Sequence, residues 1–155
     1  MAGHTDNSIV IAAPFDLVWE LTNDVTRWPR LFTEYAAAEV LERTEDTVRF
    51  RLTMHPQPDG TVWSWVSERR MDRAAREVRA RRIELGWYEY MHLHWTYAEV
   101  PGGVLMRWRQ DFEVRSDAPV TTQQIQEKIN RSTKIQMAHI KERVEEHHAE
   151  LCRSS

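Results

Sequence analysis

Disulfide bonds and membrane spans have little support in this sequence. It contains a single cysteine, Cys152, so no pair of cysteines is available for a disulfide framework. No apolar run approaches the roughly 18 residues that a membrane-spanning helix needs. The opening stretch, residues 1–7, is polar, and no signal peptide is visible. We therefore expect a cytoplasmic protein.

An excess of charge of either sign is also missing. The 21 basic and 24 acidic residues give a formal net charge of −3, which argues against binding to nucleic acid or to a membrane surface. Repeats, linkers and low-complexity segments are absent from the 155 residues, so we expect one domain over residues 1–155. What the sequence does have in quantity is tryptophan. Seven indoles must be buried in a core, a pocket or an interface.

The stretch from Val62 to Arg70 alternates as a β-strand does. Successive side chains of a strand point to opposite faces, so one face carries aromatic, hydroxyl and cationic groups together. These are Trp63, Trp65, Ser67 and Arg69. An apolar surface with a few placed polar groups is typical of a ligand pocket. The alternative is an edge strand whose Arg69 reaches water.

The rest of the chain predicts an α+β fold. We expect strands at residues 8–13, 35–43, 47–54, 62–70, 76–85, 87–100 and 104–114, short helices at 15–21 and 25–32, and a long helix from Thr121 to about Leu151. The apolar face of that helix includes Ile125, Ile129, Ile140, Val144 and Leu151. A seven-stranded antiparallel sheet with one apolar face needs a cover, and only the long helix is large enough. We expect the sheet to wrap the helix and to leave a cavity between them.

Polar residues interrupt the apolar face that the strands turn inward. Ser67, Arg69 and Gln110 lie among the aromatic positions, and Gln136 faces them from the long helix. Buried polar groups need partners, so these residues predict a polar patch inside an aromatic cavity. Tyr35 and Arg82 are further candidates. A buried ion pair of Arg69 with Glu34 or Asp111, which would only shape the fold, stays open as an alternative.

Several motifs resemble the single-domain polyketide aromatase/cyclases of bacterial type II polyketide synthesis, of the tetracenomycin and spore-pigment types. The resemblance runs from His4 to about Val144, and the most specific motif is the strand from Val62 to Arg69. Other matching segments are Leu31–Ala36, Thr53–Pro56, Gln110–Phe112, Asp117–Pro119, Ile129–Arg131 and Gln136–Ala138. The sequence differs at Trp87-Tyr88, where we expect Pro-Phe, and at His92, where we expect Asn.

The resemblance implies a helix-grip fold of the START-like superfamily. It also implies first-ring cyclisation, joining the ninth and fourteenth carbons, and aromatisation of a poly-β-ketone carried by an acyl carrier protein. The implied partners are that carrier protein and the minimal synthase, a ketosynthase with its chain-length factor, without nucleic acid or membrane. Neither a cofactor nor a metal is implied.

The same resemblance assigns roles to residues. Arg69 and Tyr35 match the proposed acid/base and anchoring groups. The predicted substrate-binding residues are Trp28, Phe32, Trp63, Trp65, Ser67, Arg82, Met91, Trp95, Trp108, Gln110 and Gln136. Chemically, Arg69 can stabilise negative charge on a carbonyl oxygen. Tyr35 can donate a proton if a neighbouring cation lowers its pKa, or a water can act in its place.

Other functions also fit parts of the sequence. A non-catalytic carrier of a hydrophobic ligand would use the same cavity. A metal enzyme could use His92 and His94, which share a strand face, but the sequence offers no evident third ligand. A serine hydrolase lacks a nucleophile-elbow motif. Nucleic-acid binding through residues 76–82 conflicts with the negative net charge.

Overall fold

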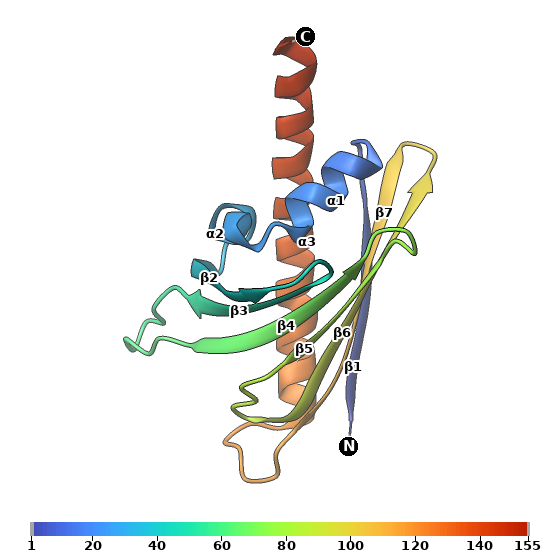
Figure 1. The fold of residues 1–155 in the computed structure, drawn as a ribbon. Coiled ribbons are helices and arrows are strands. Elements are labelled where there is room, and N and C mark those ends of the chain that lie inside the picture. Colours follow the sequence, from blue (N-terminus) through green and yellow to red (C-terminus); the bar gives the residue numbers. More distant parts are fainter. Residues whose placement is uncertain (1, 155) are drawn as a thin grey trace.

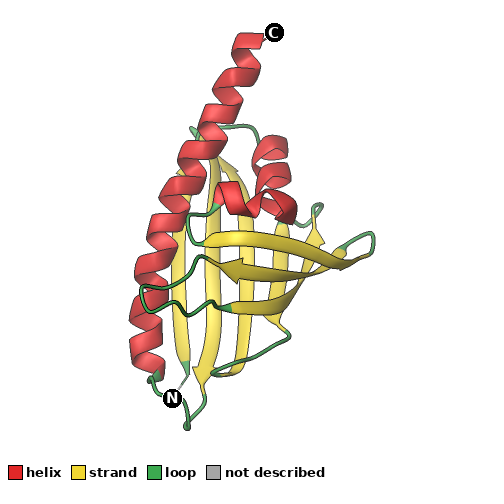
Figure 2. Ribbon diagram, turned by 90° about the vertical axis from the view of Figure 1, so that its left-hand side faces the viewer, coloured by secondary structure: helices red, strands yellow, loops and turns green. Residues whose placement is uncertain are grey.

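Antiparallel pairing joins seven strands into one sheet with the order β1-β7-β6-β5-β4-β3-β2. This computed structural model describes residues 2–154. Figures 1 and 2 show the sheet curving around the long helix α3, with α1 and α2 at one end. The elements are β1 (Gly3–Ile11), α1 (Phe15–Asn23), a 3-10 turn η1 (Val25–Arg27), α2 (Trp28–Leu31), β2 (Tyr35–Arg43), β3 (Thr47–Met54), β4 (Ser64–Asp72), β5 (Glu77–Arg82), β6 (Tyr88–Val100), β7 (Gly103–Val114) and α3 (Thr122–Ser154).

The period-two pattern of the strands places the core. Along β7, every second residue from Val104 to Val114 is buried, and the residues between them are partly or fully exposed. The buried row faces α3, so the sheet has one covered and one solvated face. The predicted α+β arrangement of a sheet wrapped around a helix is confirmed.

The face that α3 turns toward the sheet is shorter than predicted. Ile125, Ile140 and Val144 are buried and Ile129 is partly buried, but Leu151 is 51% exposed. Figure 1 shows why: the C-terminal end of α3 extends beyond the strands, where nothing packs against it. Placing Leu151 on the buried face was therefore wrong.

Several element boundaries differ from the prediction. Strand β1 begins at Gly3 and not at residue 8, and β5 ends at Arg82 and not at residue 85. The helix expected at residues 25–32 is divided into η1 and α2, because Pro29 lacks the backbone N–H that a continuous helix would use. Asp24 caps η1 by accepting a hydrogen bond from the backbone N–H of Thr26 at 3.2 Å. Strand β4 begins at Ser64 and not at Val62, so Trp63 lies in the loop that precedes it.

The interior contains two separate apolar clusters. The larger one holds Trp28, Phe32, Tyr35, Trp95 and Trp108 together with most of the core. The smaller one holds Met91, Phe112, Val114 and Ile125. Met91 was predicted to share a pocket with Arg69, but it packs in the smaller cluster. No helix within residues 2–154 is long and apolar enough to cross a bilayer.

Candidate functional site

Arg69 lies in the middle of the sheet, with Val48 of β3 on one side and Ala80 of β5 on the other. Its side chain points inward, as the alternation of β4 predicts, and only 1% of it is exposed. The guanidinium carbon lies 4.1 Å from the ring centre of Trp95 and 5.1 Å from that of Trp28. Arg69 is thus held by aromatic faces, which attract a cation.

Arg69 has two hydrogen-bond partners, the phenol of Tyr97 and an amide. Asn23, the last residue of α1, accepts a hydrogen bond from Nη2 of Arg69 through Oδ1 at 2.7 Å. The Asn23 amide nitrogen donates to the carbonyl of Trp19 at 3.0 Å, which fixes the side chain. Asn23 was not among the residues predicted for the site. Its distance of 46 residues from Arg69 leaves no local signal for the contact.

The alternative of a buried ion pair for Arg69 is wrong. Glu34 accepts a hydrogen bond from Ser132, and Asp111 binds His4 on the outer face. Within residues 2–154, no carboxylate forms an ion pair with Arg69. Burial lowers the pKa of Arg69 to about 10, so the guanidinium is charged at neutral pH without a carboxylate counter-charge.

Three buried N–H groups at this place have no acceptor within the described chain. They are Nε of Arg69 and the indole nitrogens of Trp95 and Trp108. The two indoles are stacked, with ring centres 4.1 Å apart and planes 8° from parallel. A buried donor without an acceptor costs about 1–3 kcal/mol. The cluster therefore favours a ligand that brings several oxygen acceptors into an aromatic environment.

Tyr35 opens β2 and is buried among other rings. It stacks on Trp28 with ring centres 6.0 Å apart and meets Trp65 edge-on at 6.2 Å. Burial, and then the adjacent Glu34 carboxylate, raise the pKa of the Tyr35 phenol well above its usual value. Arg82 and Arg69 act in the opposite direction but are outweighed. The condition that a neighbouring cation brings this pKa down is therefore not met overall, and the phenol keeps its proton at neutral pH.

Glu34 is a member of the site that the sequence analysis considered only as a partner for Arg69. Its carboxylate accepts a hydrogen bond from Ser132 of α3 at 3.1 Å and interacts with the Tyr35 phenol. Burial raises the pKa of the Glu34 carboxyl. A phenol and a carboxyl group in contact can exchange a proton, so together they can transfer protons in both directions.

Arg82 and Trp63, both predicted to bind substrate, have different positions. Arg82 is partly buried, lies 4.7 Å from the ring centre of Trp65 and 5.1 Å from that of Tyr88, and donates from Nε to the carbonyl of Glu84. Trp63 is 39% exposed and meets Trp87 edge-on at 4.9 Å. Because it precedes β4, Trp63 is not constrained to the inward face. Its placement in the pocket was wrong.

The remaining polar candidates are buried, and two of them hold α3 in place. Nε2 of Gln110 donates to Oγ1 of Thr133 at 3.3 Å. The amide of Gln136 accepts from the backbone N–H of Thr33 at 2.8 Å and donates to the Thr33 hydroxyl at 2.7 Å. Gln136 therefore anchors the segment between α2 and β2. Ser67 is buried between Phe50 and Arg82 on the neighbouring strands.

The space around Arg69 is filled by side chains. The ring of Trp28 lies 4.9 Å from Phe32 and 6.1 Å from Trp95, and Phe32 lies 6.0 Å from Trp108. The prediction of an open hollow at Arg69 is therefore wrong for this structure. Binding of a ligand there requires these rings to separate.

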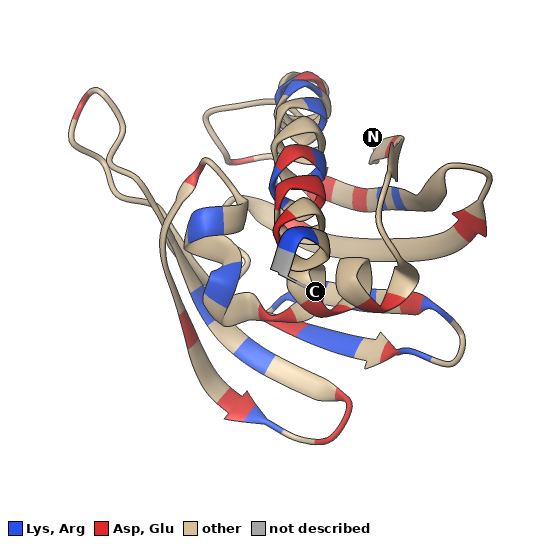
Figure 3. Cartoon of the chain, turned by 90° about the horizontal axis from the view of Figure 1, so that it is seen from above, with Lys and Arg blue, Asp and Glu red and all other residues tan. Residues whose placement is uncertain are grey.

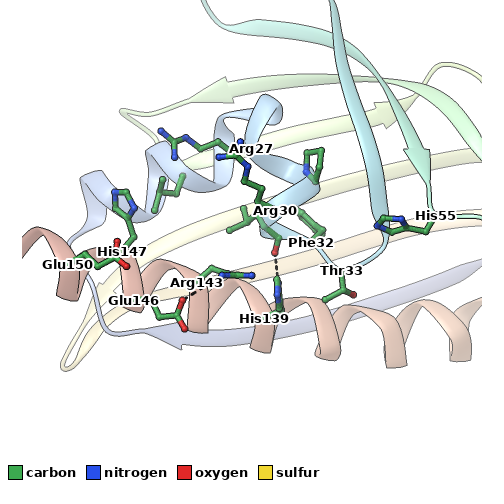
Figure 4. A pocket seen from close by; sticks show the side chains of 13 residues that line it. Arg27, Arg30, Phe32, Thr33, His55, His139, Arg143, Glu146, His147 and Glu150 are labelled. Atoms are coloured by element: carbon green, nitrogen blue, oxygen red, sulfur yellow. Dashed lines mark hydrogen bonds and ion pairs between the residues drawn. The ribbon is translucent and has the colours of Figure 1, made fainter.

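A cavity of about 570 Å³ lies next to this cluster, between the segment that contains α2 and the C-terminal half of α3. Figure 4 shows its lining, with arginine and histidine side chains from both sides. Phe32 belongs to the lining of this cavity and also contacts the rings around Arg69. Phe32 is thus shared by the cavity lining and the aromatic cluster.

One histidine of β6, His94, is a partner for charged side chains on the outer sheet face. Nε2 of His94 lies 3.0 Å from Glu77, and Nδ1 lies 3.2 Å from Nη2 of Arg109. No group of three or more His, Cys, Asp or Glu side chains within residues 2–154 is arranged to hold a metal ion.

Comparison with known proteins gives consistent results. Residues 11–131 match the family described as polyketide cyclase/dehydrase and lipid transport. A protein of Streptomyces cyaneus, named as a candidate polyketide cyclase, is 58% identical over 146 residues, which cover 94% of this chain and 96% of that protein.

Solved structures show the same fold. The ZhuI aromatase/cyclase of Streptomyces sp. R1128 has a TM-score of 0.82 at 22% identity and covers 94% of both chains. A START superfamily protein of Mycobacterium smegmatis has a TM-score of 0.68 at 13% identity, covering 96% of this chain and 98% of that one. The predicted helix-grip, START-like fold is confirmed. On the family match and the curated relative together, this chain belongs to the polyketide cyclase/dehydrase and lipid transport family.

Proposed function

We propose that this protein closes and aromatises the first ring of a poly-β-ketone carried by an acyl carrier protein, joining the ninth and fourteenth carbons by an aldol reaction followed by loss of water. The single observation that carries the proposal is the set of unpaired donors on Arg69, Trp95 and Trp108. A poly-β-ketone has a carbonyl oxygen on every second carbon. It therefore supplies several acceptors to a site that holds donors and aromatic faces.

Arg69 is the group that stabilises the oxyanion. In an aldol closure, negative charge develops on the oxygen of the carbonyl that is attacked. The guanidinium keeps its charge at neutral pH, and its Nε–H is free to donate to that oxygen. Because the site is buried, this interaction is stronger than the same contact in water.

Tyr35 and Glu34 carry out the proton transfers of the reaction. The methylene between two carbonyls of the substrate is already acidic, so the catalyst needs only a modest base. Glu34 in its ionised form accepts a methylene proton, and Tyr35 donates its proton to the alkoxide, which becomes a hydroxyl group. In the elimination, Glu34 accepts a second proton from that carbon and Tyr35 protonates the hydroxyl group, which leaves as water. Glu34, in contact with the phenol, returns a proton to it. The raised pKa of the Glu34 carboxyl suits a group that alternates between its charged and neutral forms.

The aromatic rings select the folded form of the chain. Trp28, Phe32, Trp65, Trp95 and Trp108 surround Arg69 and Tyr35 and would have to separate to admit a flat, partly cyclised chain. Holding the two reacting carbons in contact replaces a costly search among conformers, which is the main source of rate and regiospecificity here. Arg82, Ser67 and Gln110 orient carbonyls further along the chain.

The minimal synthase, a ketosynthase with its chain-length factor, would supply the substrate on its carrier protein in the cytoplasm. The decisive experiment reconstitutes that synthase with and without this protein and identifies the products. We expect the correctly closed aromatic product to replace the spontaneous shunt products. A non-catalytic carrier, the second candidate, would bind the product and leave its regiochemistry unchanged.

A further inference from the structure

The cavity between α2 and α3 gathers several basic side chains. Its lining includes Arg27 of η1, Arg30 of α2 and Arg143 of α3, together with the imidazoles of His55, His139 and His147. The protein as a whole has a net charge of −3, so this local excess is not a property of the surface in general. Figure 3, viewed from above, shows basic segments on the short helix beside α3.

The lining also holds two carboxylates, Glu146 and Glu150, so its arginines outnumber its carboxylates by one. Arg143 lies 3.7 Å from Glu146, and Arg27 is bound to Asp24 at 3.2 Å. Within residues 2–154, Arg30 forms no ion pair. Exposed pairs of this kind contribute little and exchange readily, so the guanidinium groups can bind another anion.

The position of the cavity matters as much as its charge. Leu31, Phe32 and Thr33 line it, and the Phe32 ring also contacts Trp28 and Trp108. The carbonyl of Leu31 accepts a hydrogen bond from the His139 ring at 2.8 Å, and Thr33 is bound to Gln136. The lining segment is therefore anchored to α3 on both sides of Phe32, the residue that the cavity shares with the aromatic cluster.

We propose that this cavity binds the phosphodiester group of the prosthetic arm through which the acyl carrier protein holds its chain, and that Phe32 is the point at which the chain enters. The inference rests on the proposed function for the identity of the partner. Guanidinium groups match phosphate oxygens in geometry and charge. A phosphate held at Arg30 and Arg143 would place the start of the arm outside Phe32 and direct the attached chain toward Arg69.

The experiment compares the carrier protein with and without its phosphopantetheine arm in a direct binding measurement. Wild type is expected to bind the arm-bearing form more tightly. The double variant R30A/R143A should weaken that binding at least about tenfold, equivalent to about 1.4 kcal/mol, and bind both forms equally. The difference should also shrink as salt is added. R79A, an exposed arginine on the outer face of β5, is the matched control and should change neither affinity.

Each outcome bears on one proposal. Equal binding of both carrier forms by wild type, or an unchanged preference in R30A/R143A, overturns the phosphate site even if the protein still redirects cyclisation. If the preference is present and lost in the variant while wild type leaves the product profile unchanged, the phosphate site stands and the proposed enzyme activity falls. Because both arginines are exposed, the variant is expected to keep the thermal stability of wild type.

Discussion

The guanidinium of Arg69 lies 4.1 Å from the ring centre of Trp95, in a site where no carboxylate of residues 2–154 balances its charge. A buried charge of this kind opposes folding, and its desolvation is offset by the Asn23 amide, the Tyr97 phenol and aromatic faces. A residue retained only for stability would not need to be an arginine here. This arrangement supports the proposal that the cation serves ligand binding.

The first prediction follows directly from this arrangement. Replacement of Arg69 by methionine removes the desolvation penalty and keeps most of the side-chain volume, but it leaves Oδ1 of Asn23 without its donor. These effects oppose each other, so the free energy of unfolding should change by less than about 2 kcal/mol. The aromatic product of the reconstituted synthase should give way to shunt products. Chemical denaturation and product analysis measure the two effects.

Arg69→Lys is the matched control for that variant. Lysine keeps the charge but lacks the planar fork and the Nε–H group, so it should restore only part of the correct product. A folded Arg69→Met protein that yields the wild-type product profile would remove Arg69 from the mechanism.

The second prediction concerns the phenol of Tyr35. Tyr35→Phe keeps the ring contacts with Trp28 and Trp65 and removes only the hydroxyl. Loss of a general acid should slow formation of the aromatic product by about 100-fold or more, with little change in substrate affinity. Single-turnover kinetics with carrier-bound substrate separate the two quantities. Unchanged turnover would assign the proton transfer to water.

The third prediction is a dependence of stability on pH. The pKa of the Glu34 carboxyl is raised by burial in the folded state above its ordinary value of 4.5. At pH values between 4.5 and the raised pKa, the folded protein therefore binds more protons than the unfolded chain. Through this pH range, Glu34 makes the free energy of unfolding fall as pH rises. Glu34→Gln should abolish this contribution, so the stability difference between variant and wild type should grow in favour of the variant as pH rises from about 4.5. A pH-independent difference in urea denaturation would contradict the burial effect.

The fourth prediction separates two tryptophans that the sequence analysis grouped together. Trp95 is 3% exposed and stacked on Trp108, so Trp95→Ala should cost about 3–5 kcal/mol of stability and change the product profile. Trp63 is 39% exposed, so Trp63→Ala should cost less than about 1 kcal/mol and leave the products unchanged. A Trp63→Ala variant with altered regiochemistry would return this residue to the pocket.

Local patterns in the sequence were sufficient for the architecture. The period-two alternation of β7 and of β4 predicted which residues face inward, because neighbouring side chains of a strand must point to opposite faces. Strand alternation therefore identified Arg69, Ser67 and Gln110 as buried polar residues. Alternation could not predict the orientation of Trp63, because the side chain of a loop residue need not follow the alternation of a strand.

The contacts that define the site were decided by the tertiary structure. Asn23 meets Arg69 across 46 residues, Thr33 meets Gln136 across 103, and Glu34 meets Ser132 across 98. Such pairs depend on how helices and strands pack, and no periodicity encodes them. The amount of open space around Arg69 also could not be predicted from periodicity. The sequence by itself determined that aromatic rings and a guanidinium share one face of the sheet. Only the tertiary structure decided that the rings fill the interior and that the cavity lies beside them, at Phe32. The physical reason is that the volume left open depends on all the packed side chains together.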